Sequence, residues 1–234
     1  MSDTLNDPRI AEGMRAQMEL RDRLIGSGAK QIGWKVGFGA PAMQTKLELT
    51  APVVGFLLDV ARLESGATMS LSGWTKPAAE AEIVAYIGHD LPAGANRDDV
   101  RRAIAAIGPA IELADIDVPM EDVGAALACD IFQRHVILGP RDILRSGARL
   151  DGLKGRVSRN GQDVPCPADL ETNTGQVVNV VRHVADVAAA VGGGLRAGQF
   201  IICGSITAPM FLAPGERGID FALEPIGGVS VRFS

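Results

Sequence analysis

Residues 79–87 of the chain, AEAEIVAYI, decide its fold, because they predict a strand that carries two acids on one face. Glu80 and Glu82 share one parity with Val84 and Tyr86, and the other parity is wholly apolar. Side chains at i and i+2 of a strand point the same way, so the two carboxylates would lie about 7 Å apart along it. Like charges this close repel, and each raises the pKa of the other. The strand therefore places two repelling acids in apolar surroundings.

A second apolar strand carries one further acid. Residues 109–116, PAIELADI, hold Glu112. Unpaired carboxylates are costly to bury, so three acids on two buried strands would need a cation. The three histidines have no ligand spacing and the three cysteines are scattered, so the ligands would be oxygens, which favours Mg²⁺ or Mn²⁺ over Zn²⁺ or Cu²⁺. The alternative is that the acids are solvated and bind nothing, and the residues alone leave both interpretations open.

Two further segments contain groups that chemistry could use. Lys35 lies in GWKVGF, where apolar neighbours would shield it from water and lower its pKa, which suits an acid or base. The alternative is a lysine that snorkels or forms an ion pair. Gly204-Ser205-Ile206-Thr207 forms a loop between apolar strands, with N–H groups and hydroxyls that an anion could accept. Such residues are also common in ordinary turns.

The remaining pattern predicts a mixed α+β domain with a rolled or barrel-like sheet and peripheral helices. Helical periodicity and end signals favour helices over 8–27, 40–49, 98–107 and 177–191. Apolar runs and turn signals favour strands over 32–38, 79–87, 109–116 and 136–138, a hairpin over 153–164 and further strands over 200–233. The apolar run 53–60 indicates a buried strand or a loop. There is no regular βαβ alternation, repeat or linker. We therefore expect one catalytic domain over 1–234, with a helical segment over 1–30 packed on it.

Composition excludes several classes of protein. The 234 residues are 47% hydrophobic and 22% charged, which excludes a disordered chain. The net charge is −5 and no Lys/Arg run is present, so we expect no nucleic-acid partner. The N-terminus has neither a basic nor an apolar region typical of a signal peptide, and the longest uncharged stretch, 197–215, is broken by Gly and Pro. These features predict a soluble, cytoplasmic protein without a membrane partner.

The ordered set of motifs resembles a known superfamily. GWKVG, AMQTKL, PAAEAEI, PAIELADI, LRAGQFIICGSITAP and GVSVRF follow one another between Lys35 and Phe233. This order is similar to that of the fumarylacetoacetate hydrolase superfamily, in the branch of 2-keto-4-pentenoate hydratase and 4-oxalocrotonate decarboxylase. No single motif is specific, whereas the ordered set is.

The resemblance implies a role for each motif. It implies that Glu80, Glu82 and Glu112 bind Mg²⁺ or Mn²⁺, which in turn binds a small 2-keto acid. It assigns Lys35 as an acid/base or an electrostatic partner of the substrate, and Ser205 and Thr207 as binders of its carboxylate. It also implies a β-roll fold and a homo-oligomer.

The chain departs from the family pattern at several positions. Val53 stands where the hydratases have an aspartate proposed to partner the lysine, and Asp59 is a nearby substitute in sequence. Ala78 replaces a position that is often basic, and Asp130-Ile131 stands where relatives often have Asp-Asn. The metal ligands are thus complete, whereas the groups that transfer protons differ.

The leading expectation is a metal-dependent lyase that hydrates 2-hydroxypenta-2,4-dienoate or a related acid. The alternatives are a 4-oxalocrotonate-type decarboxylase, or a non-catalytic paralogue that binds 2-keto acids or partners an active decarboxylase or hydratase. Hydrolysis of a C–C bond is less expected, because no histidine precedes His89 to activate water.

Overall fold

A curled sheet forms the centre of the molecule in the computed structural model, which describes residues 3–234. Its strands run in the order β2-β1-β10-β5-β6-β7-β3, and β11 pairs with β5. β1 and β10 are parallel, as are β3 and β7, and the other pairs are antiparallel. The strands are β1 (Gln31–Gly37), β2 (Val53–Leu58), β3 (Arg62–Leu63), β5 (Pro77–Ile87), β6 (Ile104–Asp115), β7 (Gln133–Leu138), β10 (Phe200–Ser205) and β11 (Met210–Phe211).

The sheet curls far enough for its two ends to be joined by a short segment. β2 leads through the 3₁₀ turn η2 (Asp59–Ala61) directly into β3 at the opposite edge. Leu57 of β2 and Val136 of β7 belong to one small buried cluster with Val84, Ala110 and Ile202. Side chains from distant strands meet in this cluster, so it fills part of the concave face. The predicted rolled α+β architecture is confirmed.

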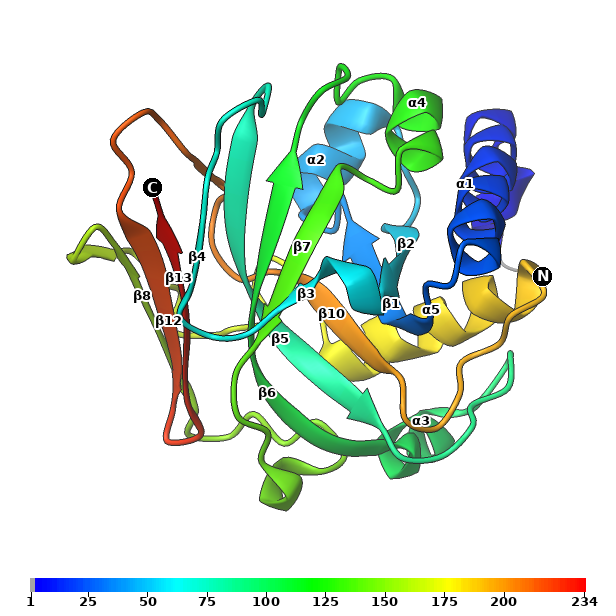
Figure 1. The fold of residues 1–234 in the computed structure, drawn as a ribbon. Coiled ribbons are helices and arrows are strands. Elements are labelled where there is room, and N and C mark those ends of the chain that lie inside the picture. The colour runs from blue at the N-terminus through cyan, green and yellow to red at the C-terminus, as the bar shows by residue number, and fades with distance from the viewer. Residues whose placement is uncertain (1–2) are drawn as a thin grey trace.

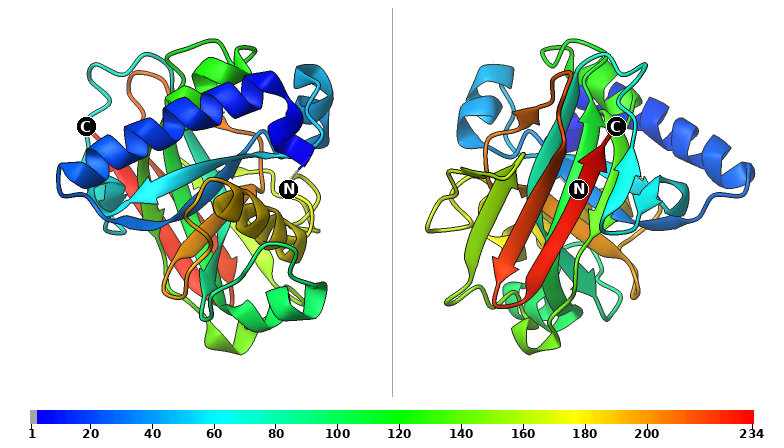
Figure 2. Two further views of the ribbon diagram at one scale, coloured as in Figure 1. Left: turned by 90° about the vertical axis from the view of Figure 1, so that its right-hand side faces the viewer. Right: turned by 60° about the vertical axis from the view of Figure 1, so that its left-hand side comes forward.

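Two layers cover the outside of the curled sheet. A second sheet, with strand order β4-β13-β12-β8-β9, packs on β6 and β7. Helices lie on the other side, as Figures 1 and 2 show. The small sheet contains β4 (Ala67–Met69), β8 (Lys154–Arg159), β9 (Gln162–Val164), β12 (Gly218–Glu224) and β13 (Gly227–Phe233). The helices are α1 (Pro8–Gly26), α2 (Pro41–Leu47), α3 (Arg97–Ala103), α4 (Val123–Ala128) and α5 (Val177–Ala190), with single turns η1 (Asp3–Asn6) and η3 (Ile143–Arg145).

Some of the predicted boundaries are wrong. The helix expected over 98–107 ends at Ala103, and β6 begins at Ile104. Ile104 pairs with Ile87 and Ile107 pairs with Ala85 of β5, so apolar residues that fitted a helix stripe extend the sheet instead. Pairing with β5 overrides the local pattern. The strand expected from Val136 likewise begins at Gln133, and the helix α4 has no counterpart in the sequence prediction.

α1 packs closely on α4 because glycine occupies the contact. A Cβ atom on Gly13 would lie 2.7 Å from Leu127 Cβ and 2.8 Å from the Gly124 oxygen. Nearby, the buried Gln17 donates a hydrogen bond from Nε2 to the Leu127 oxygen over 3.1 Å. The N-terminal helix is thereby anchored to the end of α4, from which the chain enters the candidate site. Among residues 3–234, no helix combines the length and apolar character that crossing a membrane requires.

Substituting Gly13 by alanine is expected to destabilise the protein by about 1–3 kcal/mol, because the added methyl group overlaps packed atoms. The control is Gly26→Ala at the last residue of the same helix, where a Cβ would meet no atom within 4 Å. This control should be neutral or stabilising by up to about 1 kcal/mol. Urea unfolding of both variants measures the difference, and equal stabilities would contradict the close packing.

Candidate metal and substrate site

Three carboxylates from two neighbouring strands converge on the concave face of the curled sheet. Glu80 and Glu82 lie on β5, and Glu112 lies on β6 directly opposite Glu80. One oxygen from each group lies within 4.8 Å of the others. Glu82 and Glu112 are fully buried, and Glu80 is half-buried at the wall of a cavity. The register of β5 and β6 thus brings together the three acids that the sequence predicts to be close.

The cluster is electrostatically unfavourable by itself. Burial, followed by repulsion from Glu112, raises the pKa of Glu80 to about 7. The same two causes, with repulsion from Glu80, raise the pKa of Glu82 well above its usual range, although the Gly204 N–H donates to Glu82 Oε2 over 2.6 Å. Three ionised carboxylates therefore cannot share this volume unless positive charge is added.

The donor set fits a hard divalent cation. Glu82 Oε1 and Glu112 Oε2 are buried without a hydrogen-bond partner. Within the described residues, no histidine or cysteine belongs to the cluster. Carboxylate oxygens are the ligands that Mg²⁺ and Mn²⁺ prefer in proteins. The two orphaned oxygens are thus explained if Glu80, Glu82 and Glu112 hold such an ion.

This electrostatic arrangement predicts that stability of the metal-free protein falls as pH rises. Between pH 4.5 and about 7, Glu80 binds its proton in the folded state and loses it in the unfolded state. The folded state then binds more protons, so unfolding becomes easier with rising pH. Mg²⁺ should raise the melting temperature at least roughly 4 °C more at pH 7.5 than at pH 5.5. In EDTA, Glu80→Gln should lose less stability with rising pH than the unmodified protein does. An equal loss of stability would contradict the raised pKa of Glu80.

Lys35 of β1 lies beside the acids. Its ammonium group forms an ion pair with Glu112 and donates a hydrogen bond to the Ile131 oxygen over 2.9 Å. Burial lowers the pKa of Lys35, but Glu112, Asp130 and Glu80 outweigh burial and raise that pKa overall. The ion-paired alternative is therefore confirmed, and the expectation of a lowered pKa is wrong, because apolar neighbours are only part of the lysine's surroundings. Lys35 is therefore a charged ammonium group in this arrangement.

A left-handed turn after α4 supplies a fourth buried acid. Asp130, Ile131 and Phe132 all have φ between 52° and 64°, a conformation that non-glycine residues rarely adopt. Asp130 Oδ1 accepts a hydrogen bond from Phe56 N over 2.9 Å. A Cβ on Gly55 would lie 2.7 Å from this oxygen and 2.9 Å from Lys35 Cγ. Gly55 therefore lets Asp130 approach the lysine.

Asp130 lies near enough to Lys35 that its carboxyl group, when ionised, raises the pKa of the lysine. Burial raises the pKa of Asp130 well above its usual range. Val53 is buried and does not line the cavity. Asp59 does not join the site either, because it is exposed and caps the Lys30 and Val60 N–H groups. The suggested substitution by Asp59 is thus wrong, and Asp130 is the additional acid beside Lys35.

The C-terminal loop faces the carboxylates across a bulge in β10. Register with β5 shifts between Ile202 and Ser205, and Gly204 has φ 95°. The bulge directs the Gly204 N–H at Glu82 and places Ser205 in the cavity wall, where its Oγ is buried without a partner. Thr207 also lines the cavity, and its Oγ1 donates to the Ala208 oxygen over 3.2 Å. Their role in binding a carboxylate stays a prediction.

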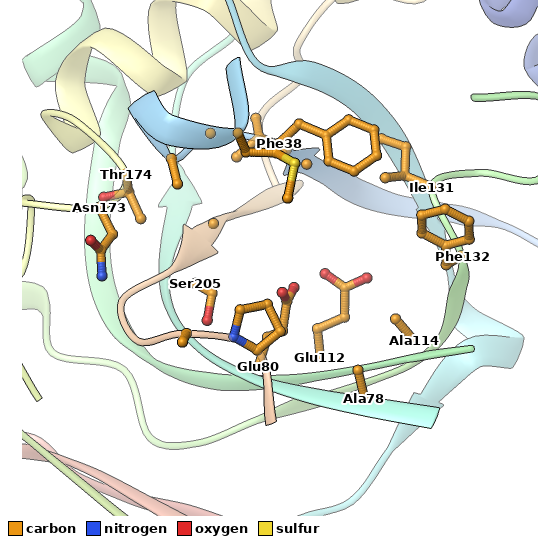
Figure 3. A pocket seen from close by; sticks show the side chains of 18 of the residues that line it. Phe38, Ala78, Glu80, Glu112, Ala114, Ile131, Phe132, Asn173, Thr174 and Ser205 are labelled. Atoms are coloured by element: carbon orange, nitrogen blue, oxygen red, sulfur yellow. The ribbon is translucent and has the colours of Figure 1, made fainter. Parts of the chain in front are cut away.

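The cavity has a volume of about 360 Å³, which suits a small organic molecule. Figure 3 shows Asn173, Thr174 and Ser205 on one side of the two labelled carboxylates. Asn173 Nδ2 donates to the Ile206 oxygen over 2.9 Å, so this loop and the C-terminal loop hold each other. Asn173 and Thr174 are not among the residues predicted from the sequence, because an irregular loop has no periodicity that would signal them.

Comparison with known proteins agrees with this architecture. The family model described as "Fumarylacetoacetate (FAA) hydrolase C-terminal" matches residues 28–234. A 2-hydroxyhexa-2,4-dienoate hydratase from Comamonas testosteroni is 29% identical over 218 residues, which is 89% of this chain and 80% of that protein.

Two solved structures of 4-oxalocrotonate decarboxylase from Pseudomonas putida G7 share the fold over 100% of this chain and 90% of theirs. The complex with calcium and acetate has a TM-score of 0.87 at 28% identity, and the complex with magnesium and adipate has 0.86 at 26%. With its curled sheet and matching sequence over residues 28–234, the chain belongs to the fumarylacetoacetate (FAA) hydrolase C-terminal family.

Proposed function

We propose that this protein is a divalent-metal-dependent lyase of a small 2-keto or 2-hydroxy-dienoic acid, with hydration as its leading reaction. The observation that carries the proposal is the cluster of three carboxylates, two with orphaned buried oxygens, beside a charged lysine in one cavity. The similarity to a hydratase and to a metal-bound decarboxylase supports the same class of chemistry.

The metal ligands and the lysine have different tasks. Glu80, Glu82 and Glu112 would hold Mg²⁺ or Mn²⁺, which when bound supplies Lewis-acid stabilisation of negative charge that develops on the substrate's 2-oxygen. The Lys35 ammonium group has three N–H donors, and two of them bind Glu112 and the Ile131 oxygen. The third would donate a proton to the substrate or neutralise charge on it.

The opposite wall would orient the acid group of the substrate. The Ser205 hydroxyl lacks a protein partner, so it can donate to a substrate carboxylate. Thr207 is proposed to assist it. The net hydration of 2-hydroxypenta-2,4-dienoate adds a proton at C5 and a hydroxyl group at C4.

Decarboxylation is the second candidate, favoured by the high structural similarity to 4-oxalocrotonate decarboxylase. A non-catalytic paralogue is the third, because Val53 replaces an aspartate of the hydratases. A homo-oligomer, or a complex with a related decarboxylase or hydratase, belongs to the same set of proposals, as does a cytoplasmic location.

An ultraviolet assay tests the proposed function. Loss of the conjugated enol band of 2-hydroxypenta-2,4-dienoate or 2-hydroxymuconate should require Mg²⁺ and stop with EDTA. Product analysis then separates hydration from decarboxylation. Oxalate binding with Mg²⁺ but no turnover of either compound would favour the non-catalytic paralogue. Absence of both oxalate binding and turnover would contradict the whole proposal.

A further inference from the structure

The two sides of the cavity differ in polarity. Asn173, Thr174 and Ser205 lie on one side of Glu80 and Glu112, whereas Ile131, Phe132 and Ala114 lie on the other (Figure 3). A substrate bound through its acid group to the polar side would extend its tail toward the apolar side. The side chains on the apolar side therefore indicate which kind of substrate tail the cavity accepts.

The apolar side is a wall without hydrogen-bonding side chains. Phe38 and Phe132 meet edge to face with ring centroids 6.4 Å apart, and Ile131 and Phe132 are each only 4% exposed. Ala78 and Ala114 form the floor beside Glu112 (Figure 3). Ala78 has a short, uncharged side chain, whereas a longer side chain at this position would fill part of the cavity.

Positive charge is scarce around this cavity. Among the described lining residues, Lys35 is the single Lys or Arg, and its ammonium group is already committed to Glu112. Lys76 is exposed at the rim, with Nζ 4.5 Å from the centroid of the Phe211 ring. A solvated rim cation would strengthen binding of a distal carboxylate by at most about fivefold.

We propose that the site selects a 2-keto or 2-hydroxy-dienoic acid whose far end is an uncharged hydrocarbon, and that it rejects a second carboxylate there. This inference rests on the proposed function, since it assumes that the acid end meets the polar side. A second carboxylate would be buried against Phe132 and Ile131 without a partner, which is costly. Each methylene group buried there would instead strengthen binding about fourfold.

A matched pair of ligands tests the tail directly. 2-Oxohexanoate and 2-oxoadipate both have six carbons and share the 2-keto acid head, but only 2-oxoadipate ends in a second carboxylate. Calorimetry with the full chain and saturating Mg²⁺ should show 2-oxohexanoate binding at least about tenfold more tightly. Binding should also strengthen from pyruvate through 2-oxobutanoate and 2-oxopentanoate to 2-oxohexanoate.

A charge introduced at the cavity wall should weaken the preference for the uncharged tail. Met43 of α2 lines the cavity and is half-buried, so lysine can replace it with its ammonium group near solvent. Met43→Lys is expected to shift the ratio of the two affinities toward 2-oxoadipate by up to about fivefold, whereas the control Met43→Leu leaves the ratio unchanged.

The outcomes separate the two proposals. Tighter binding of 2-oxoadipate than of 2-oxohexanoate by the unmodified chain would overturn the inference. If Lys76→Met then lost this preference for 2-oxoadipate, the second carboxylate would be placed at the rim beside Lys76. Oxalate is the control for the head group, because it has no tail. Failure of oxalate to bind with Mg²⁺ would overturn the proposed function, and with it the inference, whatever the tail results.

Discussion

Replacing Glu82 by glutamine is expected to lower metal-dependent turnover at least about a thousandfold, which corresponds to about 4 kcal/mol of transition-state stabilisation. Glutamine has nearly the same shape, and its carbonyl oxygen can still accept the hydrogen bond that Gly204 N donates. The orphaned Oε1, however, becomes an amide NH₂ group, which repels a cation instead of binding it.

Folding should survive this substitution, which makes the activity loss interpretable. Glutamine removes one of three mutually repelling carboxyl groups, so the melting temperature in EDTA should be equal to or above that of the unmodified protein. Addition of Mg²⁺ should raise the melting temperature of the unmodified protein and not that of Glu82→Gln.

Glu121→Gln is the matched control, because Glu121 is an exposed acid paired with Lys46 on the surface. Its turnover and its response to Mg²⁺ should equal those of the unmodified protein. Retention of full EDTA-sensitive turnover by Glu82→Gln would remove Glu82 from the metal site.

The centre of the site is predictable from the sequence because a strand converts spacing into geometry. Two acids at i and i+2 must share a face of β5, and the apolar character of both strands indicates that the acids are buried. Spacing alone does not specify the pairing of β5 with β6, which places Glu112 opposite Glu80. The order of the motifs predicts the rest of the rolled fold.

Other parts of the site depend on contacts between distant segments, which local patterns do not encode. The left-handed turn at Asp130 is held by Phe56 of β2, 74 residues away in sequence. Asn173 lies in an irregular loop, and its hydrogen bond to the Ile206 oxygen holds it at the cavity. The prediction for the pKa of Lys35 is wrong for the same reason: its direct sequence neighbours are apolar, whereas its spatial neighbours are acids.

Lys35→Met is expected to separate the structural role of the lysine from its chemical role. Lys35 and Glu112 form a pair in which both side chains are almost fully buried. Removing one partner leaves an uncompensated buried carboxylate, which should destabilise the metal-free protein by about 3 kcal/mol or more. The control Lys46→Met breaks a pair that is more than half exposed, and it should cost at most about 1 kcal/mol.

Mg²⁺ decides between the two roles. Lys35→Met removes the positive partner of Glu112, and a bound cation supplies positive charge in its place. Saturating Mg²⁺ should therefore restore most of the stability of Lys35→Met. If Lys35 donates a proton or neutralises charge on the substrate, turnover should nevertheless stay at least about a hundredfold below that of the unmodified protein.

The informative comparison is thus made at Mg²⁺ concentrations where both proteins are equally stable, with enol loss and melting temperature followed on the same samples. Wild-type turnover by the metal-stabilised Lys35→Met would show that the lysine is only a counter-ion for Glu112. Restored stability with lost turnover would instead place Lys35 in the chemistry, because the cation can replace its charge beside Glu112 but cannot replace its proton.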